Sequence, residues 1–359
     1  MKFDYCTGNP PYQKESKNSQ SETNGQKPMT NIFHYFQQQA DEITKESSVM
    51  IYPGGRWIHQ SGKGLKEFGK KLINSPELSV VEFYPNANDV FGNAAQLSDG
   101  ISIVVKKKNN KEDGFKYIYN KDGKETIVHA EHPGDNLMPL NPFDLPIAQK
   151  VDKVVKSKHL SYLHEAILPR SLFAIESDFA EKNPDKVRLF NGTNIDYSKG
   201  EIKLYTNDKA GKAGRATWFV ANKDVITNNV EHVDKWQVVV SSANAGGQKR
   251  DNQLTIIDNH SAFGRARLAL RSFNTKEEAD NFYAYVSTYF IRYTFLLTDE
   301  ALSSLGKKVP DIENYTNENP YIDFTKNIDE QLFEMFSLTD EEITYIKYVV
   351  DNLRKKELD

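Results

Sequence analysis

The stretch that decides the fold is KFDYCTGNPPY, residues 2–12 of the chain. Its first part, Lys2–Thr7, is short and rich in strand-forming residues, and it stops at a glycine, an asparagine and two prolines. Proline lacks the backbone N–H of a strand ladder and disfavours helix at the residue before it. The pattern therefore predicts a strand that ends at Gly8, followed by an extended loop, Asn9–Tyr12.

The segments around this loop alternate between strand and helix patterns. Residues 13–27 are polar without periodicity, which predicts a loop, and residues 30–47 carry apolar side chains at helical spacing, with Thr30 or Asn31 as a cap. Further patterns predict strands at 48–52, 80–84, 101–105 and 115–119 and a helix at 64–73. These elements predict part of an open α/β sheet, in which ligands bind at the carboxyl ends of the strands.

Length and composition limit the classes of protein. The chain has 359 residues, which favours two domains at roughly 150 residues each, and a net charge of −4 permits a polyanion partner without requiring one. The one cysteine, Cys6, excludes an intrachain disulfide and a cysteine-rich zinc site. No apolar run reaches the roughly 18 residues of a membrane span, and the first residues do not resemble a secretory signal. We expect a soluble, cytoplasmic chain without a membrane partner.

The composition changes at residues 129–146, where four prolines predict a linker. We therefore place a domain boundary near residue 135, with domains 1–135 and 136–359. The second domain is predicted to be mixed α+β and to end in a helical segment. Its elements are strands at 202–205, 217–220 and 236–241 and helices at 146–157, 275–292, 328–336 and 340–355.

The tetrad Asn9-Pro10-Pro11-Tyr12 resembles the catalytic loop of the amino-methylating DNA methyltransferases, which reads Asn/Asp-Pro-Pro-Tyr/Phe after a strand. An exocyclic adenine amine is a poor nucleophile because its lone pair is delocalised into the ring. The Asn9 side-chain oxygen and the Pro10 carbonyl can accept its two hydrogens and stabilise the positive charge that develops on nitrogen. A base inside a duplex must be flipped out, and Tyr12 offers a ring for stacking. The alternative is a proline-stiffened turn with an exposed tyrosine.

The resemblance extends to three further segments, which are similar to adenine methylases of restriction-modification systems: Met50–Trp57, Gly62–Phe68 and Asp89–Val105. It implies that Phe91 closes on the flipped base, although a core phenylalanine under a loop would read the same. It also implies a partial Rossmann-like methyltransferase sheet in residues 1–135 and a DNA-binding target-recognition domain in residues 136–359. The activity implied is adenine-N6 methylation of double-stranded DNA.

The chain departs from this family at the cofactor site. Amino-methyltransferases bind S-adenosylmethionine on a glycine-rich turn between a strand and a helix. Ala245-Gly246-Gly247 is not followed by a convincing helix, and Phe263-Gly264-Arg265 lacks the second glycine. We therefore expect the segments that bind S-adenosylmethionine to be absent from this chain and to be supplied by a partner polypeptide or an upstream segment.

Basic residues in the second half are candidates for DNA binding. They are Lys249, Arg250, Arg265, Arg267 and Arg271. Arginine suits phosphates and guanine edges because its planar fork donates two parallel hydrogen bonds. The alternative is a solvated surface whose charges form salt bridges.

Two other functions remain open. One is a DNA-specificity subunit that reads a sequence without catalysing a reaction. The other is a nuclease of the PD-(D/E)xK type built on Asp185, Glu201 and Lys203, in which two carboxylates and a lysine hold Mg²⁺ and position water. His129 and His132 lie in the proline-rich segment, and we interpret them as surface residues. No metal site is predicted.

Overall fold

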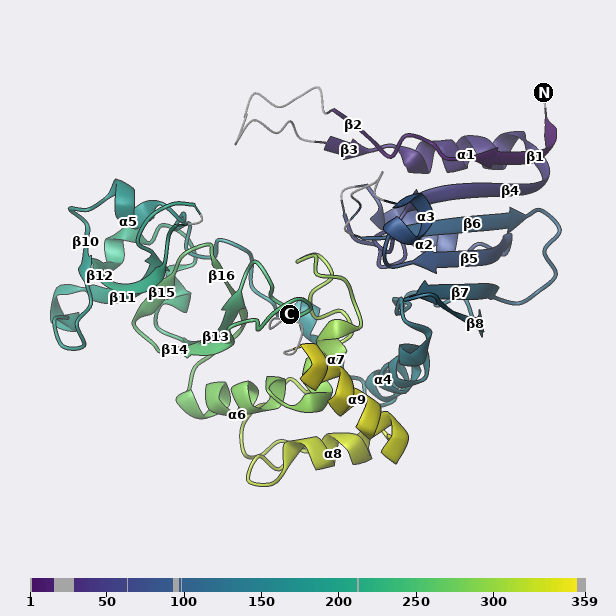
Figure 1. Ribbon diagram of the computed structural model, residues 1–359. Coiled ribbons are helices and arrows are strands. Elements are labelled where there is room, and N and C mark those ends of the chain that lie inside the picture. The colour runs from purple at the N-terminus through teal and green to yellow at the C-terminus, as the bar shows by residue number, and fades with distance from the viewer. Residues whose placement is uncertain are drawn as a thin grey trace. The chain divides into compact units, whose positions relative to one another are not determined.

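The computed structural model describes residues 2–15, 29–62, 64–92, 97, 99–211 and 213–353. The chain divides into two compact units, drawn in Figure 1. The first unit is Met1–Gln149 with Leu297–Ser304, and the second unit is Lys150–Leu296 with Leu305–Asp359. The division falls between Gln149 and Lys150, within α4 (Leu145–Ser157). The boundary predicted near residue 135, between a catalytic portion and a target-recognition domain, lies inside the first unit and stays a prediction.

The first unit is built on a six-stranded sheet in the order β1-β4-β6-β5-β7-β8. Strand β1 is parallel to β4, and β5 is parallel to β7, whereas β6 is antiparallel to both of its neighbours and β8 is antiparallel to β7. The strands are β1 (Phe3–Gly8), β4 (Thr44–Pro53), β5 (Leu78–Tyr84), β6 (Ile101–Lys107), β7 (Phe115–Lys121) and β8 (Lys124–Ala130). The carboxyl ends of β1, β4, β5 and β7 therefore share one edge of the sheet.

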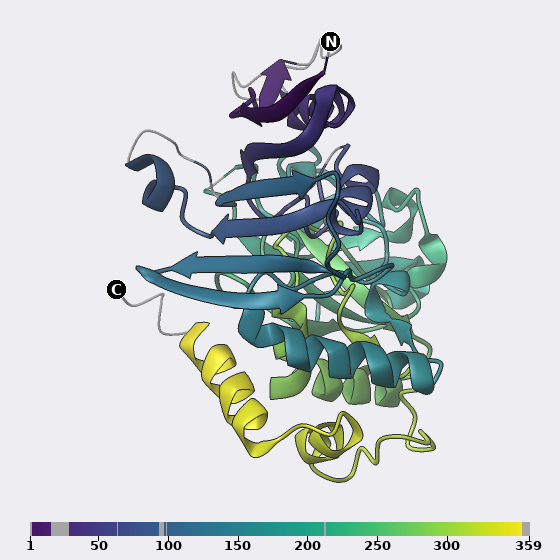
Figure 2. The same cartoon turned by 90° about the vertical axis from the view of Figure 1, so that its right-hand side faces the viewer.

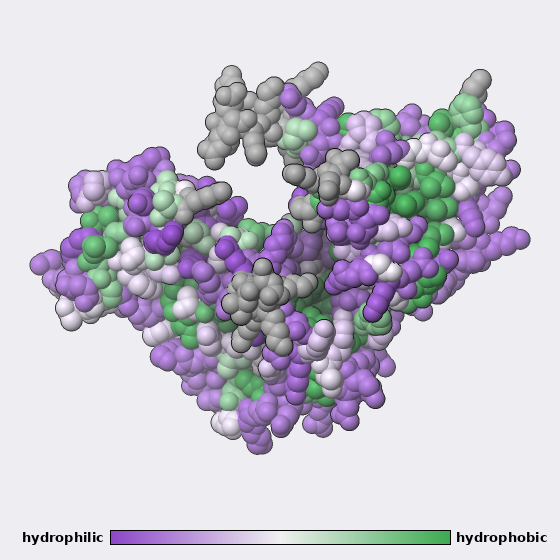
Figure 3. Space-filling view, in the orientation of Figure 1, coloured by the Kyte–Doolittle hydropathy of each residue, from purple (hydrophilic) through white to green (hydrophobic). Residues whose placement is uncertain are grey.

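Two helices cover one face of this sheet, as Figures 1 and 2 show: α1 (Phe33–Ile43) and α2 (Lys66–Ile73). Burial alternates along the central strands, so that Tyr52 and Tyr117 lie in the core beneath these helices and are fully buried. The opposite face carries half-buried apolar residues, with Val49 paired to Val105 in register. Figure 3 shows hydrophobic residues gathered over the strands of the first unit in that view.

Short elements complete the first unit. Strands β2 (Gln13–Glu15) and β3 (Met29–Asn31) pair antiparallel directly after the predicted catalytic loop, and α3 (Asn88–Phe91) follows β5. Most of the loop predicted at residues 13–27 lies outside the described residues.

The second unit contains two main sheets with helices beside them. One sheet has the order β10-β12-β11-β15, and the other has the order β14-β13-β16. Their strands are β10 (Val187–Leu189), β11 (Glu201–Asn207), β12 (Ala216–Asn222), β13 (Trp236–Ser241), β14 (Thr255–Ile257), β15 (Ser261–Phe263) and β16 (Arg267–Phe273). The helices are α5 (Phe179–Lys182), α6 (Lys276–Val286), α7 (Tyr289–Leu296), α8 (Ile328–Met335) and α9 (Asp340–Leu353), and a two-stranded pair joins β9 (Ser161–Tyr162) to β17 (Pro310–Asp311). The predicted fold class, a partial α/β sheet followed by a mixed α+β region, is confirmed.

Two predicted helices were wrong in extent. The helix predicted at 30–47 ends at Ile43, because Thr44–Ser47 continue into β4 and pair with β1. Its N-cap residue is Ile32, and neither Thr30 nor Asn31 caps it. The helix predicted at 275–292 is interrupted at Ser287 and Thr288, since the Asp329 carboxylate accepts hydrogen bonds from the backbone N–H groups of Tyr289 and Phe290 (3.0 and 3.1 Å) and starts a new helix there.

The predicted proline-rich linker is partly structured, because its first residues, His129 and Ala130, end strand β8. In the part of the chain that the structure describes, no helix is long and apolar enough to cross a membrane.

Candidate active site

The tetrad Asn9-Pro10-Pro11-Tyr12 follows the last residue of β1, at the sheet edge where parallel strands end. Gly8 pairs with Met50 of β4, so the loop leaves the sheet at a fixed point. Pro10 is buried, whereas Asn9 and Pro11 are exposed. Within the described residues the Asn9 side-chain amide makes no hydrogen bond to the protein. A rigid loop thus presents an amide whose oxygen is free to accept a hydrogen bond from a ligand.

Tyr12 is fixed by a backbone hydrogen bond and by packing of its ring. Its carbonyl oxygen accepts a hydrogen bond from the backbone N–H of Ile32 (3.0 Å), and its half-buried ring packs against the core of the first unit. The phenolic oxygen is buried without a hydrogen-bond partner among the described residues, and burial raises the pKa of this phenol. Only the solvent-facing part of the ring is therefore available to a ligand.

Phe91 is the last residue of α3 and is half-buried. It follows β5, whose carboxyl end lies on the same edge of the sheet as the tetrad. Since β4 and β6 lie between β1 and β5, the two segments leave the sheet roughly 14 Å apart, at about 4.8 Å per strand. Residues 93–96 and 98, which connect α3 to β6, lie outside the described residues.

The loop after β4 adds Arg56, which lies in the segment similar to adenine methylases but received no role from the sequence. Arg56 is exposed, although Gly54, Gly55 and residues 57–61 are buried. Its Nε lies 3.7 Å from Oδ2 of Asp99. The pattern Gly-Gly-Arg-Trp after a strand was the signal for this arginine, because glycines and a tryptophan favour a buried loop around an exposed charge.

The side chains of three predicted DNA-binding arginines contact other residues of the second unit. Arg265 forms an ion pair with Glu176 (2.6 Å), and Arg271 forms one with the buried Asp311. Arg267 is buried and donates to the Gln253 side-chain oxygen (2.7 Å) and to the Tyr205 hydroxyl (2.9 Å), with its guanidinium over the Tyr205 ring. These contacts agree with the alternative of salt-bridged or structural arginines.

The other two, Lys249 and Arg250, are exposed on the loop between β13 and β14. Arg250 and Arg292 both line a cavity of about 420 Å³ in the second unit, together with Asp251 and apolar residues of α7 and α9. Of the five candidates, these two residues are exposed, whereas Arg265 and Arg271 are half-buried and Arg267 is buried.

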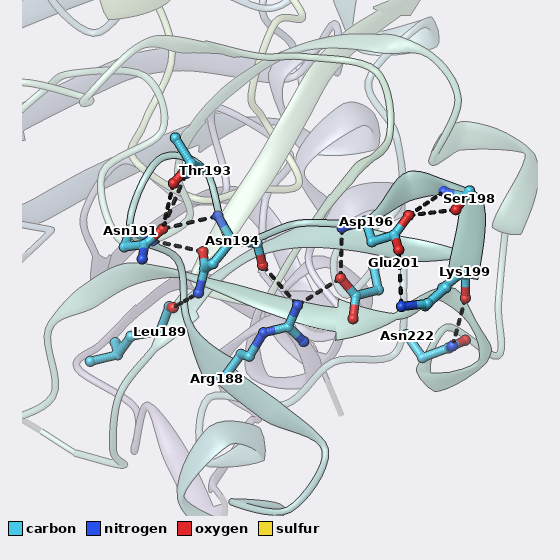
Figure 4. A network of polar contacts seen from close by, with 10 residues as sticks. All are labelled: Arg188, Leu189, Asn191, Thr193, Asn194, Asp196, Ser198, Lys199, Glu201 and Asn222. Atoms are coloured by element: carbon cyan, nitrogen blue, oxygen red, sulfur yellow. Dashed lines mark hydrogen bonds and ion pairs between the residues drawn. The ribbon is translucent and has the colours of Figure 1, made fainter.

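Two of the three residues of the nuclease alternative, Glu201 and Lys203, contact other partners, as Figure 4 shows for Glu201, and Asp185 is exposed. Glu201 forms an ion pair with Arg188 (2.6 Å) and accepts a hydrogen bond from the backbone N–H of Asp196 (2.8 Å). Lys203 pairs with Asp258. Among the described residues, no group of three histidine, cysteine or acidic side chains is placed to hold a metal ion.

The two histidines of the proline-rich segment bind separate backbone carbonyls. His129 Nε2 lies 2.6 Å from the Asp113 oxygen, and His132 Nδ1 lies 2.7 Å from the Ile73 oxygen. The structure does not bring them together as a pair of ligands.

The glycines considered for S-adenosylmethionine do not form the strand-to-helix turn on which amino-methyltransferases bind this cofactor. Gly246 and Gly247 lie between β13 and β14, and Gly264 lies between β15 and β16. Each therefore joins two strands, and none opens a helix. In the ranges that the structure describes, these residues do not fit the cofactor.

The α/β sheet of the first unit carries Asn-Pro-Pro-Tyr at the carboxyl end of β1, and this part of the chain is similar to methylases of restriction-modification systems. Residues 1–91 match the family model described as Eco57I restriction-modification methylase. The resemblance stated from the sequence is thus confirmed over this segment, which contains the tetrad and Phe91. No curated protein matches the chain.

Solved structures give more distant likenesses. The type IIL restriction-modification enzyme MmeI in complex with DNA is 9% identical, with a TM-score of 0.46, over 98% of this chain and 57% of that chain. The type IIG restriction endonuclease BpuSI is 10% identical, with a TM-score of 0.31, over 98% and 53%. The methyltransferase subunit of a type I system from Streptococcus thermophilus is 19% identical, with a TM-score of 0.25, over 36% and 29%. The chain spans little more than half the length of the first two.

Proposed function

We propose that this chain provides the catalytic loop and the target-recognition part of an adenine-N6 DNA methyltransferase of a restriction-modification system. The observation that carries the proposal is the Asn9 amide, which is exposed and has no hydrogen-bond partner among the described residues, on a proline-stiffened loop at the carboxyl end of β1. A family match over residues 1–91 supports it.

The role of Asn9 follows from the chemistry of the amine. Its side-chain oxygen and the Pro10 carbonyl accept the two N6 hydrogens, which shifts electron density onto the nitrogen as it attacks a methyl group. Positive charge develops on that nitrogen, and the two oxygens stabilise it in the transition state. Methyl transfer would be direct, without a covalent enzyme intermediate: the amine nitrogen bonds the methyl carbon as the bond from that carbon to the donor sulfur breaks, and the nitrogen then loses one proton to solvent. The adenine is flipped out of the duplex, with Tyr12 and Phe91 as the aromatic side chains that contact it.

The methyl donor in this proposal is S-adenosylmethionine, held by a polypeptide segment other than the described residues. Gly246, Gly247 and Gly264 join strands, and this favours a cofactor-binding half supplied by a partner or by further sequence. The same observation favours the second candidate, a DNA-specificity subunit without catalysis of its own. The two candidates differ in whether Asn9 takes part in a reaction.

Recognition of DNA is assigned to residues 136–359. Lys249 and Arg250 are the exposed basic candidates there, and we propose that they contact the phosphate backbone or base edges. The other three candidates stabilise the fold of this region through contacts within the protein: Arg265, Arg267 and Arg271.

The test is a single-turnover methylation assay with the cofactor-binding half supplied, run beside an equilibrium titration with duplex DNA. Asn9→Ala should lower the rate by about 10²–10³, as loss of a comparable oriented hydrogen-bonding group does, and should leave DNA binding nearly unchanged. Asn88→Ala is the matched control, because Asn88 is also an exposed asparagine near this sheet edge. Full activity in Asn9→Ala would leave the specificity-subunit candidate in front.

A further inference from the structure

Arg56 stands out of a loop whose other residues are buried. Gly54, Gly55 and residues 57–61 have little or no exposure, yet 46% of the Arg56 side chain is accessible to solvent. A charged side chain that leaves a buried loop is directed to solvent by the fold rather than by its own mobility.

The loop that carries Arg56 is fixed on both sides. The backbone N–H groups of Gly54 and Gly55 donate to the carbonyls of Gly100 (2.7 Å) and Asp99 (3.0 Å). A Cβ on Gly54 would overlap the Asp99 carbonyl, so only glycine permits this approach. On the other side, Trp57 is fully buried and its Nε1 donates to the Ser102 hydroxyl (2.7 Å). The position of the Arg56 backbone is therefore set before any ligand arrives.

The end of the guanidinium is available. Its Nε lies 3.7 Å from Asp99 Oδ2, whereas within the described residues Nη1 and Nη2 make no hydrogen bond or ion pair. Burial raises the pKa of Asp99, while Arg56 acts in the opposite direction and the nearby Asp299 and Glu300 add to the effect of burial. Arg265, Arg267 and Arg271 differ from Arg56, because their terminal nitrogens are bound within the protein.

Arg56 lies at the same edge of the sheet as the proposed catalytic loop. Strand β4 is the parallel neighbour of β1, so the loop with Arg56 and the tetrad leave the sheet at the same edge. A Cβ built on Gly62 would lie 3.8 Å from Arg56 Cδ and 4.0 Å from Asn31 Nδ2. Asn31 in turn accepts a hydrogen bond from Gln13 (3.1 Å), the residue after Tyr12. Gly62 therefore lies close to both Arg56 and Asn31, and Asn31 bonds the residue that follows the tetrad.

We propose that Arg56 binds a DNA backbone phosphate beside the adenine that Asn9 receives, and so positions the flipped nucleotide. The inference rests on the proposed function, because it assumes that DNA meets this edge of the sheet. Flipping rotates a nucleotide about its own backbone, and the flanking phosphate must be held for the base to reach a defined place. A free guanidinium fork donates two parallel hydrogen bonds to phosphate oxygens, and a rigid loop reduces the entropy lost on binding. Arg56 is thus a positioning residue.

The experiment measures binding of the full chain to a short duplex with one unpaired adenine and to the same duplex fully paired, at several salt concentrations. Wild-type protein should prefer the duplex with the unpaired adenine. Arg56→Ala should lose that preference and lower the slope of log affinity against log salt by about 0.9, so that its affinity falls about 3.5-fold less than that of wild type between 50 and 200 mM salt. Arg56→Lys should keep the slope and lose part of the preference, because an ammonium lacks the planar fork.

Lys45→Ala is the matched control. Lys45 is an exposed cation at the amino end of β4, paired with Asp4 (3.1 Å), so its removal changes the net charge equally at the opposite edge of the sheet. It should keep the slope and the preference of the wild type. Asp99→Asn in the Arg56→Ala background separates DNA binding from folding. If Arg56 only balanced the charge of the half-buried Asp99, removing that charge would restore the slope and the preference of the wild type.

Three results would overturn the inference: an unchanged slope and preference in Arg56→Ala, rescue of both by Asp99→Asn, or a wild-type chain that binds neither duplex or does not distinguish them. Failure of the proposed function is read separately, since it appears as full methylation by Asn9→Ala. If that variant were fully active while Arg56→Ala lost the preference, the function would fail and the phosphate contact would stand.

Discussion

Replacing Arg271 with alanine should destabilise the second unit rather than remove a DNA contact. The side chain pairs with Asp311, which is 1% exposed, and it lies over the rings of Phe273 and Tyr315. Asp311 also accepts hydrogen bonds from the Tyr315 hydroxyl (2.9 Å) and from the backbone N–H of Glu313 (2.8 Å). Those two donors remain in Arg271→Ala, but the cation that balances the buried carboxylate is gone.

The expected size follows from this burial. Removing one partner of a buried ion pair costs about 3–5 kcal/mol, because the other charge is left without compensation. A unit of about 150–250 residues loses about 2–4 °C in Tm per kcal/mol, so the melting temperature should fall by about 6–20 °C. Adding Asp311→Asn to Arg271→Ala should recover part of the loss, since the uncompensated charge is then removed.

The assay is urea unfolding of the full chain followed by circular dichroism, with Arg250→Ala as the control. Arg250 is exposed, and its substitution should leave the unfolding midpoint unchanged. A loss below about 1 kcal/mol in Arg271→Ala would refute the reasoning, because a pair buried as described cannot be removed so cheaply. DNA-binding data on Arg271 variants therefore need a folding measurement beside them.

Two further predictions concern the first unit. Tyr12→Phe should be neutral or should stabilise the protein by up to about 1–3 kcal/mol, because the buried hydroxyl that it removes has no hydrogen-bond partner among the described residues; a clear loss of stability in thermal unfolding would mean that this hydroxyl is bonded in solution. Burial of Glu77 opposes its ionisation, but the ammonium groups of Lys108 and Lys106 outweigh burial and lower the pKa of this carboxyl. Its contribution to stability is therefore present above the ordinary pKa of 4.5 and is lost as the pH falls through the pKa of the folded state. Glu77→Gln should accordingly lower the free energy of unfolding at neutral pH and narrow its gap from wild type below pH 4.5, and a gap independent of pH would count against this pairing.

The sheet of the first unit was predictable because its signals are local. Residues 101–105 and 115–119 carry the apolar runs of buried strands, and both became strands with two added residues at the carboxyl end. The tetrad was placed correctly at the end of a strand for the same reason, since Gly8 and the prolines stop the ladder within the segment itself.

The arginines of the second unit could not be interpreted from the sequence, because their partners are distant along the chain. Glu176 lies 89 residues from Arg265, Tyr205 lies 62 residues from Arg267, and Asp311 lies 40 residues from Arg271. A cluster of positive charge in the sequence became three separate structural contacts. Arg56 was hidden for the opposite reason, because a single arginine gives no charge pattern and only the buried loop around it reveals its exposure.

Strand β1 contains a cysteine whose reactivity can report on the strand. Cys6, the one cysteine of the chain, lies three residues before Asn9, pairs with Ser48 of β4 and packs partly against the core. Because the Cys6 side chain is half-buried against the core, the rate of its alkylation should rise when β1 opens locally, and this rate then reports on the strand that carries the proposed catalytic loop. Protection of the thiol by a binding partner, or its release by denaturant, can be followed without introducing a label by mutation.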